Sequence, residues 1–339
     1  MKILVTGGTG YIGSHTVVEL QQQGFEVVII DNLSNSQIGV IDAITSITGI
    51  KPHFEQFDLV NRELTSQFFS RHTDIMGVIH FAAFKAVGES VEKPLKYYRN
   101  NLVSLMNILE SMSEFNIPNL VFSSSCTVYG QPDELPVSEK APTKKAESPY
   151  GNTKQISEEI IQDTLKSSKM NAIALRYFNP IGAHESAKIG ELPLGVPNNL
   201  VPFITQTAIG IRQQLSVFGD DYNTPDGTAV RDYIHVVDLA QAHVIAVKRM
   251  IELKMKQSFE IFNLGTGTGL SVLDVITSFE RVSGEKLNYK IVGRRAGDIE
   301  QVWANSDFSN EVLGWKAKKT VDEMTASAWK WEKVYREIV

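Results

Sequence analysis

Short apolar runs alternate with segments of helical periodicity along the first half of the chain. Compact runs rich in Val, Ile and Phe predict strands, and apolar residues recurring every three to four positions predict helices. The strands predicted in this half are 2–7, 27–31, 53–58, 77–82, 119–125 and 173–178, and the helices are 11–23, 62–70, 100–114 and 149–169. This βαβα series favours an α/β fold in which a parallel sheet carries helices on both faces. Ligands of such a sheet bind at the carboxyl ends of its strands.

The regular alternation breaks after Asn179. Residues 180–230 are rich in Gly, Pro and Asn and contain one short helical segment at 201–212; helix 236–250, strand 259–265 and helix 271–283 follow. We therefore predict a first domain at 1–179 and a smaller α/β substrate-binding region at 180–339. Elements at about 236–270 are expected to pack back on the first domain.

Composition and charge exclude several classes of protein. The chain has 339 residues, 42% of them hydrophobic, which is enough apolar material for one large core or two ordinary ones. Its formal net charge of -6 argues against a surface for nucleic acid. The longest apolar runs are far shorter than the roughly 20 residues that cross a bilayer, and the first residues leave no room for a signal peptide. We expect a cytoplasmic protein with neither nucleic-acid nor membrane partners.

Cysteine and histidine usage predicts neither a disulfide nor a metal site. A single cysteine, Cys126, cannot form an internal disulfide, which fits a reducing compartment. The seven histidines show no pairing at metal-ligand spacing, so most are expected to have structural or surface roles.

A glycine-rich turn follows the first predicted strand and opens the first predicted helix. It reads T-G-G-T-G-Y-I-G, with Gly7, Gly10 and Gly13. Such a turn brings backbone N–H groups and the positive end of a helix to a pyrophosphate, although glycine turns also simply connect strands to helices. Asp31 at the end of the second strand can accept hydrogen bonds from a ribose and would repel a 2′-phosphate. The turn and the acid predict a Rossmann-type domain that binds NAD rather than NADP.

A tyrosine and a lysine stand four residues apart, as Tyr150 and Lys154, after an S-S-S turn that ends at Ser125. On a helix this spacing places both side chains on one face. A free tyrosine has a pKa near 10, and a neighbouring ammonium together with an oxidised nicotinamide would lower it, which makes the phenolate a base. With the G-x-x-G-x-x-G spacing of the turn, these residues resemble the extended branch of the short-chain dehydrogenase/reductase superfamily.

Further blocks resemble one family of that branch, UDP-glucose 4-epimerase, over nearly the whole chain. They read H-F-A-A-F-K-A-V-G-E-S from His80, L-R-Y-F-N-P-I-G-A-H from Leu175, P-N-N-L from Pro197 and V-R-D-Y-I-H-V-V-D-L from Val230, with Trp303 after R-R-A-G-D. The resemblance implies that bound NAD oxidises C4 of a UDP-hexose, that the 4-keto sugar turns over, and that the hydride returns to its other face. UDP-glucose and UDP-galactose are thereby interconverted without net oxidation. The family also implies a homodimer built on helices 100–114 and 149–169.

The same resemblance assigns residues to each part of the site. Tyr150, Lys154 and Ser125 would be catalytic. The expected cofactor contacts are Gly7, Gly10, Tyr11, Ile12, Gly13, Asp31, Asn32, Asp58, Leu59, Phe81, Ala82, Lys85, Asn100, Ser125, Tyr150, Lys154, Tyr177 and Phe178. The expected UDP-sugar contacts are Lys85, Ser125, Tyr150, Asn179, Asn199, Leu200, Phe218, Arg231, Arg295, Asp298 and Val302. The two arginines suit a diphosphate because their donors are forked, and Phe218 could stack on uracil.

Two positions depart from the family pattern. Val302 stands where many hexose-only members carry a tyrosine, which would widen the pocket near C2 of the sugar and admit an N-acetyl group; simple packing is the alternative for this valine. Phe84 adds bulk beside the cofactor and has no functional explanation from the sequence.

Two rival functions start from the same fold. A nucleotide-sugar 4,6-dehydratase shares the C4 oxidation but needs carboxylates after the serine of the S-S-S block, where this chain has Cys126 and Thr127. A non-catalytic NAD-binding sensor would be expected to lack Tyr150, Lys154 or Ser125.

Overall fold

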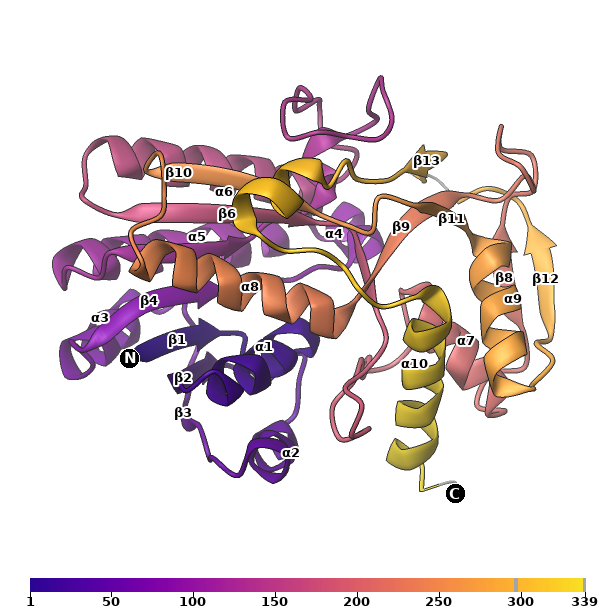
Figure 1. The fold of residues 1–339 in the computed structure, drawn as a ribbon, viewed down its shortest axis with the longest axis horizontal. Coiled ribbons are helices and arrows are strands. Elements are labelled where there is room, and N and C mark those ends of the chain that lie inside the picture. The colour runs from indigo at the N-terminus through magenta and orange to yellow at the C-terminus, as the bar shows by residue number, and fades with distance from the viewer. Residues whose placement is uncertain (296–297, 338–339) are drawn as a thin grey trace.

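A seven-stranded sheet forms the centre of the larger lobe in the computed structural model, which describes residues 1–295 and 298–337. The strand order is β10–β6–β5–β4–β1–β2–β3, and all neighbouring strands are parallel (Figure 1). The order reverses between β1 and β4, where a doubly wound sheet opens a crevice for ligands. The predicted fold class is confirmed. The strands are β1 (Lys2–Thr6), β2 (Glu26–Asp31), β3 (His53–Gln56), β4 (Ile75–His80), β5 (Asn119–Ser123), β6 (Asn171–Tyr177) and β10 (Phe259–Leu264).

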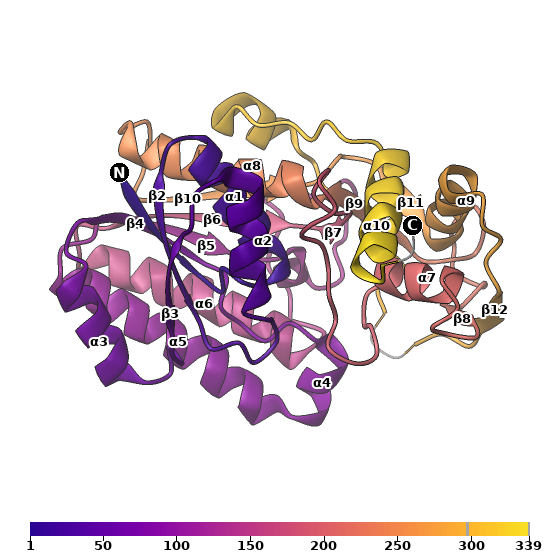
Figure 2. The ribbon, with the colours of Figure 1, turned by 90° about the horizontal axis from the view of Figure 1, so that it is seen from below.

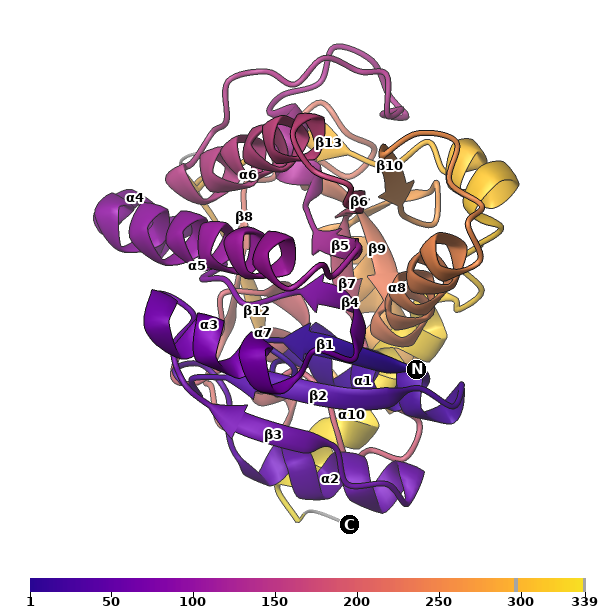
Figure 3. The same cartoon turned by 90° about the vertical axis from the view of Figure 1, so that its left-hand side faces the viewer.

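Helices cover both faces of this sheet. Helices α3, α5 and α6 lie on one side of the strands and α8 lies on the other, together with α1 and α2 (Figure 3). Successive side chains of a strand point to opposite faces, so Ile3 packs toward α1 and α8 while Leu4 packs toward α3 and α5. The helices are α1 (Tyr11–Gln22), α2 (Gly39–Thr48), α3 (Arg62–Arg71), α4 (Val87–Glu92), α5 (Pro94–Glu114), α6 (Pro149–Lys166) and α8 (Val236–Ile251).

A smaller lobe lies beyond the carboxyl ends of the central strands (Figures 1 and 2). It contains a sheet of order β11–β9–β13 with β7 paired to β9, a two-stranded sheet of β12 and β8, and three helices around a second apolar core. Its elements are β7 (Asn179–Ile181), α7 (Leu200–Ala208), β8 (Leu215–Phe218), β9 (Val230–His235), β11 (Gly269–Ser271), α9 (Val272–Ser283), β12 (Tyr289–Val292), β13 (Gln301–Val302) and α10 (Val321–Tyr335).

The chain passes between the two lobes more than once. Strand β9 leads directly into α8 on the larger lobe, β10 then pairs with β6, and β11 lies again in the smaller lobe. Two short helical turns, η1 (Cys126–Tyr129) and η2 (Ser309–Leu313), complete the elements. The division of the chain at residue 180 stays a prediction. Among the described helices, none combines the length and the apolar composition of a membrane span.

Several elements differ from the sequence prediction. Helix α5 begins at Pro94 rather than at residue 100, because proline suits the first turn of a helix. Helices α2, α4 and α10 were not predicted, although Thr320 and Glu323 form a capping box at the start of α10. The short strands of the smaller lobe were also missed, since their partners are distant in the sequence.

Candidate active site

The glycine turn between β1 and α1 leaves no room for side chains at two positions. Gly7 has φ +70°, and a Cβ there would lie 2.9 Å from the backbone nitrogen of Ala82. A Cβ on Gly13 would lie 2.2 Å from the carbonyl oxygen of Gly7. Gly10 caps α1 without a side-chain hydrogen bond, so the positive end of the helix faces outward for an anion. This geometry fits the pyrophosphate of a dinucleotide.

Carboxylates stand at the carboxyl ends of β2 and β3, which neighbour each other at one side of the sheet. Asp31 closes β2 and accepts hydrogen bonds from the backbone nitrogens of Leu33 (2.9 Å) and Thr9 (3.3 Å). Asn32 donates to Asp58 at 3.2 Å, which joins the ends of β2 and β3. The Asp31 carboxylate is therefore fixed at the carboxyl edge of the sheet, where a ribose of the expected NAD would be recognised.

Helix α6 positions the predicted base. The Ser148 hydroxyl accepts a hydrogen bond from the backbone nitrogen of Gly151 (3.1 Å), and Pro149 occupies the first turn. Tyr150 and Lys154 are both buried, with Lys154 Nζ 5.9 Å from the centre of the Tyr150 ring. The helix thus presents both side chains on its face toward the sheet, as predicted from their spacing.

Ser125 lies where β5 turns into η1, next to α6. Its hydroxyl accepts from the backbone nitrogen of Thr127 (3.2 Å), and its side chain is near enough to Tyr150 to lower the pKa of that phenol. Lys154 Nζ donates to the carbonyl oxygen of Ser123 at 2.7 Å, two residues before Ser125. The structure therefore brings the three predicted catalytic residues together from two elements.

Burial dominates the pKa values of Tyr150 and Lys154 in the chain without its cofactor. Burial raises the pKa of Tyr150 well above its ordinary value of 10, the nearby Tyr177 raises it further, and the Ser125 side chain opposes this rise. Burial also lowers the pKa of Lys154 to about 8. The expectation that Lys154 and an oxidised nicotinamide together lower the pKa of Tyr150 stays a prediction, because in the chain without its cofactor burial has the largest effect.

Glu191 is a site residue that the sequence reasoning missed. Its carboxylate, with a side chain only 12% exposed, accepts from Lys85 Nζ at 3.2 Å and from Asn199 Nδ2 at 2.6 Å. Lys85 Nζ also lies 5.9 Å from the centre of the Tyr11 ring, and the Tyr11 hydroxyl donates to Gly182 O at 2.6 Å. Glu191 thus connects an expected cofactor contact with an expected substrate contact. No local motif marked it, because its partners are far away in the sequence.

A second group of expected substrate contacts surrounds Arg231 on β9. Val302 on β13 is its register partner, and Val302 is buried in a cluster with Phe178 and, partly buried, Cys126. Arg231 donates to the backbone oxygen of Val230 at 2.8 Å, and within the described residues no carboxylate pairs with it. Its guanidinium therefore retains donors for an anionic ligand.

A third group lies in the smaller lobe, where Arg295 and Phe218 approach each other. The Arg295 guanidinium lies 5.6 Å from the centre of the Phe218 ring and pairs with Asp298 at 2.7 Å. Phe218 is 40% exposed, so its ring is free to contact a ligand. Ala296 and Gly297 of the R-R-A-G-D block lie outside the described residues.

The remaining predicted positions are spread over several elements of the two lobes. The Tyr177 hydroxyl accepts from Ser123 Oγ at 3.1 Å, and Asn100 donates to the side chain of Asn101 at 3.0 Å. Phe84 packs its ring 5.7 Å from that of Tyr97, which gives this unexplained residue a packing role. The other positions are Ile12 on α1, Leu59 after β3, Phe81 and Ala82 after β4, Asn179 on β7 and Leu200 at the start of α7.

The fold, the glycine turn and the Tyr–Lys–Ser arrangement define a short-chain dehydrogenase/reductase. A protein-family model described as GDP-mannose 4,6 dehydratase matches residues 4–328. A protein of Yersinia enterocolitica named UDP-glucose 4-epimerase is 49% identical over 335 residues, which cover 98% of this chain and 98% of that protein. The chain belongs to the UDP-glucose 4-epimerase family.

Two solved structures show the same fold over the full length of both chains. The UDP-glucose 4-epimerase of Bifidobacterium longum in complex with NAD⁺ and UDP has a TM-score of 0.95 at 43% identity, covering 100% of each chain. The enzyme of Stenotrophomonas maltophila, with bound NAD and formylated UDP-arabinopyranose, has a TM-score of 0.96 at 46% identity and the same coverage. The resemblance inferred from the motifs is confirmed.

Proposed function

We propose that this protein is an NAD-dependent isomerase that interconverts UDP-glucose and UDP-galactose through a transient 4-keto sugar. The observation that carries the proposal is the meeting of Tyr150, Lys154 and Ser125 at the same carboxyl edge of the sheet as the glycine turn. Membership of the epimerase family supports the same activity. Bound NAD⁺ would take up a hydride from C4 of the sugar, return it, and add a positive charge to the site.

The chain's own residues would handle the proton and hold the substrate. Tyr150 would take the proton of the C4 hydroxyl and later give it back, while Ser125 would hydrogen-bond the same sugar oxygen. Lys154 would hold its positive charge beside the phenol. Arg231 and Arg295 would bind the diphosphate, and Phe218 would stack on the uracil. A firmly anchored nucleotide and a loosely held hexose would let the ketone turn over.

Asp31 and the glycine turn would select and hold the cofactor. The Asp31 carboxylate already accepts backbone hydrogen bonds at the strand end, which orient it toward a ribose. A 2′-phosphate would meet this charge, which favours NAD over NADP. The absence of a Cβ at Gly7 lets the turn pack closely against the backbone of Ala82.

The dehydratase activity in the name of the family model is the main rival. It requires an acid and a base beyond Tyr150, and the residues after Ser125 are Cys126 and Thr127. Burial raises the pKa of the Cys126 thiol to about 12, so it would not supply a thiolate near neutrality. The 49% identical relatives are epimerases, which also disfavours the dehydratase.

One assay separates these functions. Purified protein, washed free of loose nucleotide, is given UDP-galactose without added NAD, and the products are resolved by chromatography. Epimerisation to UDP-glucose with no accumulated keto product is expected. A 4-keto-6-deoxy sugar would instead identify a dehydratase. No turnover of UDP-galactose, with or without added NAD, would indicate a non-catalytic NAD-binding sensor. A Ser168→Ala variant, altered in the loop after α6, is the matched control for a Ser125→Ala loss of activity.

Val302 supports a wider substrate range that includes UDP-GlcNAc and UDP-GalNAc. It is 4% exposed, lies beside Arg231 in the β9–β13 register, and packs near Cys126. Val302→Tyr should reduce turnover of the N-acetylhexosamines while UDP-galactose turnover is retained, because the larger ring would extend into the sugar pocket. Val302→Leu, of similar size, should retain both activities. Equal turnover of N-acetylhexosamines in the tyrosine variant and the native protein would refute this role.

We further propose a cytoplasmic homodimer that associates through the helical face of α4, α5 and α6. Val91 on α4 and Leu95 on α5 are 61% and 78% exposed, which is unusual for two large apolar side chains only four residues apart in the sequence. Size-exclusion chromatography with light scattering gives the mass directly. A monomer at micromolar concentration would contradict the dimer, and Leu95→Glu should shift a dimer toward monomer.

A further inference from the structure

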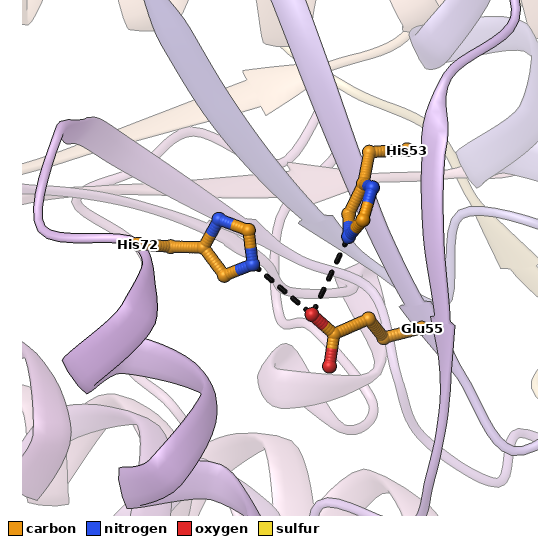
Figure 4. Close-up of side chains that lie close together, drawn as sticks. All are labelled: His53, Glu55 and His72. Atoms are coloured by element: carbon orange, nitrogen blue, oxygen red, sulfur yellow. Dashed lines mark hydrogen bonds and ion pairs between the residues drawn. The ribbon is translucent and has the colours of Figure 1, made fainter.

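Two histidines and a glutamate converge at the edge strand of the central sheet. His53 and Glu55 are two residues apart on β3, so their side chains point to the same face, and His72 follows the last residue of α3 (Figure 4). The Glu55 Oε1 atom lies 3.0 Å from His72 Nε2 and 3.4 Å from His53 Nε2. One ligand atom from each residue lies within 4.8 Å of the other two.

His53 and His72 differ from the other histidines of the chain in their exposure to solvent. Five of the seven histidines in the chain are buried, and they are His15, His80, His184, His235 and His243. The two that reach solvent, His53 and His72, both turn toward the same carboxylate oxygen. The sequence spacing indicated no metal pair because His72 comes from a different element, which the fold brings next to β3.

Two of the three separations between ligand atoms fit neighbouring ligands of one metal ion. Zn²⁺ binds imidazole nitrogen and carboxylate oxygen at about 2.0–2.2 Å, so neighbouring ligands of a tetrahedral site are roughly 3.3 Å apart. The separations of 3.0 and 3.4 Å lie close to that value. Two imidazoles and one carboxylate are a donor set that suits zinc and leaves a further position for water.

Neighbouring residues hold two of the three ligands in place. The His72 ring packs against Phe68 with centroids 4.5 Å apart, and the His72 side chain is only 17% exposed. Arg71 donates to Glu55 Oε2 at 2.6 Å, which orients the carboxylate and leaves Oε1 directed toward the histidines. The nearby guanidinium charge and the 54% exposed His53 side chain favour micromolar rather than tighter affinity.

We propose that His53, Glu55 and His72 form a surface site for a Zn²⁺ ion that links edge strand β3 to the end of α3. The site lies on the sheet edge remote in sequence and structure from Tyr150, since β3 is the outermost strand and β5 and β6 flank the catalytic turn. A bound ion would stabilise the folded chain, because it binds the native arrangement and the unfolded chain lacks it. The proposal stands independently of the epimerase activity.

The test is a titration of untagged protein with ZnCl₂ in a buffer that does not coordinate zinc. Calorimetry is expected to give one ion per chain with micromolar affinity, and Co²⁺ should give visible absorption bands of a low-coordinate site. His53→Gln and Glu55→Gln should each weaken Zn²⁺ binding at least tenfold. Glu63→Gln, which changes an exposed residue of α3, is the matched control and should bind Zn²⁺ like the native chain.

Thermal unfolding supplies a second readout. Zn²⁺ should raise the Tm of the native protein and of Glu63→Gln, but should leave the Tm of His53→Gln unchanged. Because His53 is exposed, its variant should fold and should retain UDP-hexose turnover. No saturable Zn²⁺ binding below about 100 micromolar, or binding that survives His53→Gln and Glu55→Gln, would overturn the site and leave the three residues as an ordinary hydrogen-bonded cluster.

Discussion

Lys154 is a buried cation whose replacement should stabilise the protein while abolishing its activity. The side chain is 5% exposed, and burial lowers its pKa from 10.5 to about 8. Lys154 Nζ donates a hydrogen bond to the carbonyl oxygen of Ser123 and lies over the rings of Phe122 and Tyr150, 4.9 and 5.9 Å from their centres. The Glu158 carboxylate is engaged by Arg176, so it compensates the Lys154 charge only in part. We therefore predict that Lys154→Met unfolds less readily than the native chain.

The size of this effect follows from the pKa. A pKa lowered from 10.5 to about 8 corresponds to a folding penalty of about 3 kcal/mol while the side chain is charged. Methionine keeps most of the apolar stem, and the lost hydrogen bond to Ser123 costs about 1–2 kcal/mol. At pH 7 the variant should thus be more stable by about 1–2 kcal/mol.

The stability difference between Lys154→Met and the native chain should depend on pH. The folded state releases the Lys154 proton near pH 8, whereas the unfolded state keeps it until about pH 10.5. The penalty is therefore fully present below pH 8 and disappears as the pH rises toward 10.5. Across this window the native protein should gain stability relative to Lys154→Met, and the lost hydrogen bond should finally make the variant the less stable chain.

Urea unfolding of cofactor-free protein at pH 7, 8, 9 and 10 measures this difference. Lys166→Met is the matched control, because Lys166 lies on the same helix with a side chain that is 75% exposed. Its stability difference from the native chain should not change between pH 8 and 10. A Lys154→Met variant that is less stable at pH 7, or whose difference is independent of pH, would refute the reasoning. Loss of epimerase turnover in a stabilised variant would link the buried charge to function.

Three other substitutions test the site. Tyr150→Phe should lower kcat by about 10²–10⁴-fold with little change in the KM for UDP-galactose. Steady-state kinetics measures both constants, and a retained kcat would contradict the catalytic role of Tyr150. Gly13→Ala should lower the amount of NAD bound, because its Cβ would lie 2.2 Å from the carbonyl oxygen of Gly7. The NAD content is measured after denaturing the purified protein, and an unchanged content would show that the turn can shift to accept the Cβ. Glu191→Ala should raise the KM for UDP-galactose several-fold with kcat nearly unchanged, since Lys85 loses its partner, and an unaltered KM would count against a positioning role.

The central sheet could be predicted from the sequence because its signals are local. Strands such as Lys2–Thr6 are apolar on both faces, and the helices between them carry a clear period, so their types and order follow from neighbouring residues. The smaller lobe gives no such signal. Its strand Asn179–Ile181 is three residues long and exists because it pairs with Val230–His235, far along the chain. The local pattern of apolar and polar residues does not indicate pairings between strands so distant in the sequence.

The residues of the candidate site also differ in whether local sequence patterns predict them. Gly7, Asp31 and Tyr150 stand in motifs whose spacing reflects one turn, one strand end and one helix, and these could be located directly. Glu191 could not, because its importance comes from two partners on other elements. The convergence of His53 and His72 is equally a product of the fold, since one lies on a strand and the other follows a helix.

Tyr150 and Lys154 demonstrate what a spacing predicts and what it omits. Four residues on a helix place the two side chains on one face, and the structure has them there. The spacing carries no information on burial, and burial decides the sign of the pKa change: it raises the pKa of the phenol and lowers that of the ammonium. The protein's own groups therefore hold Tyr150 neutral. A phenolate at this position requires a further positive charge in the site, which ties the strength of the proposed base to the oxidised form of the cofactor.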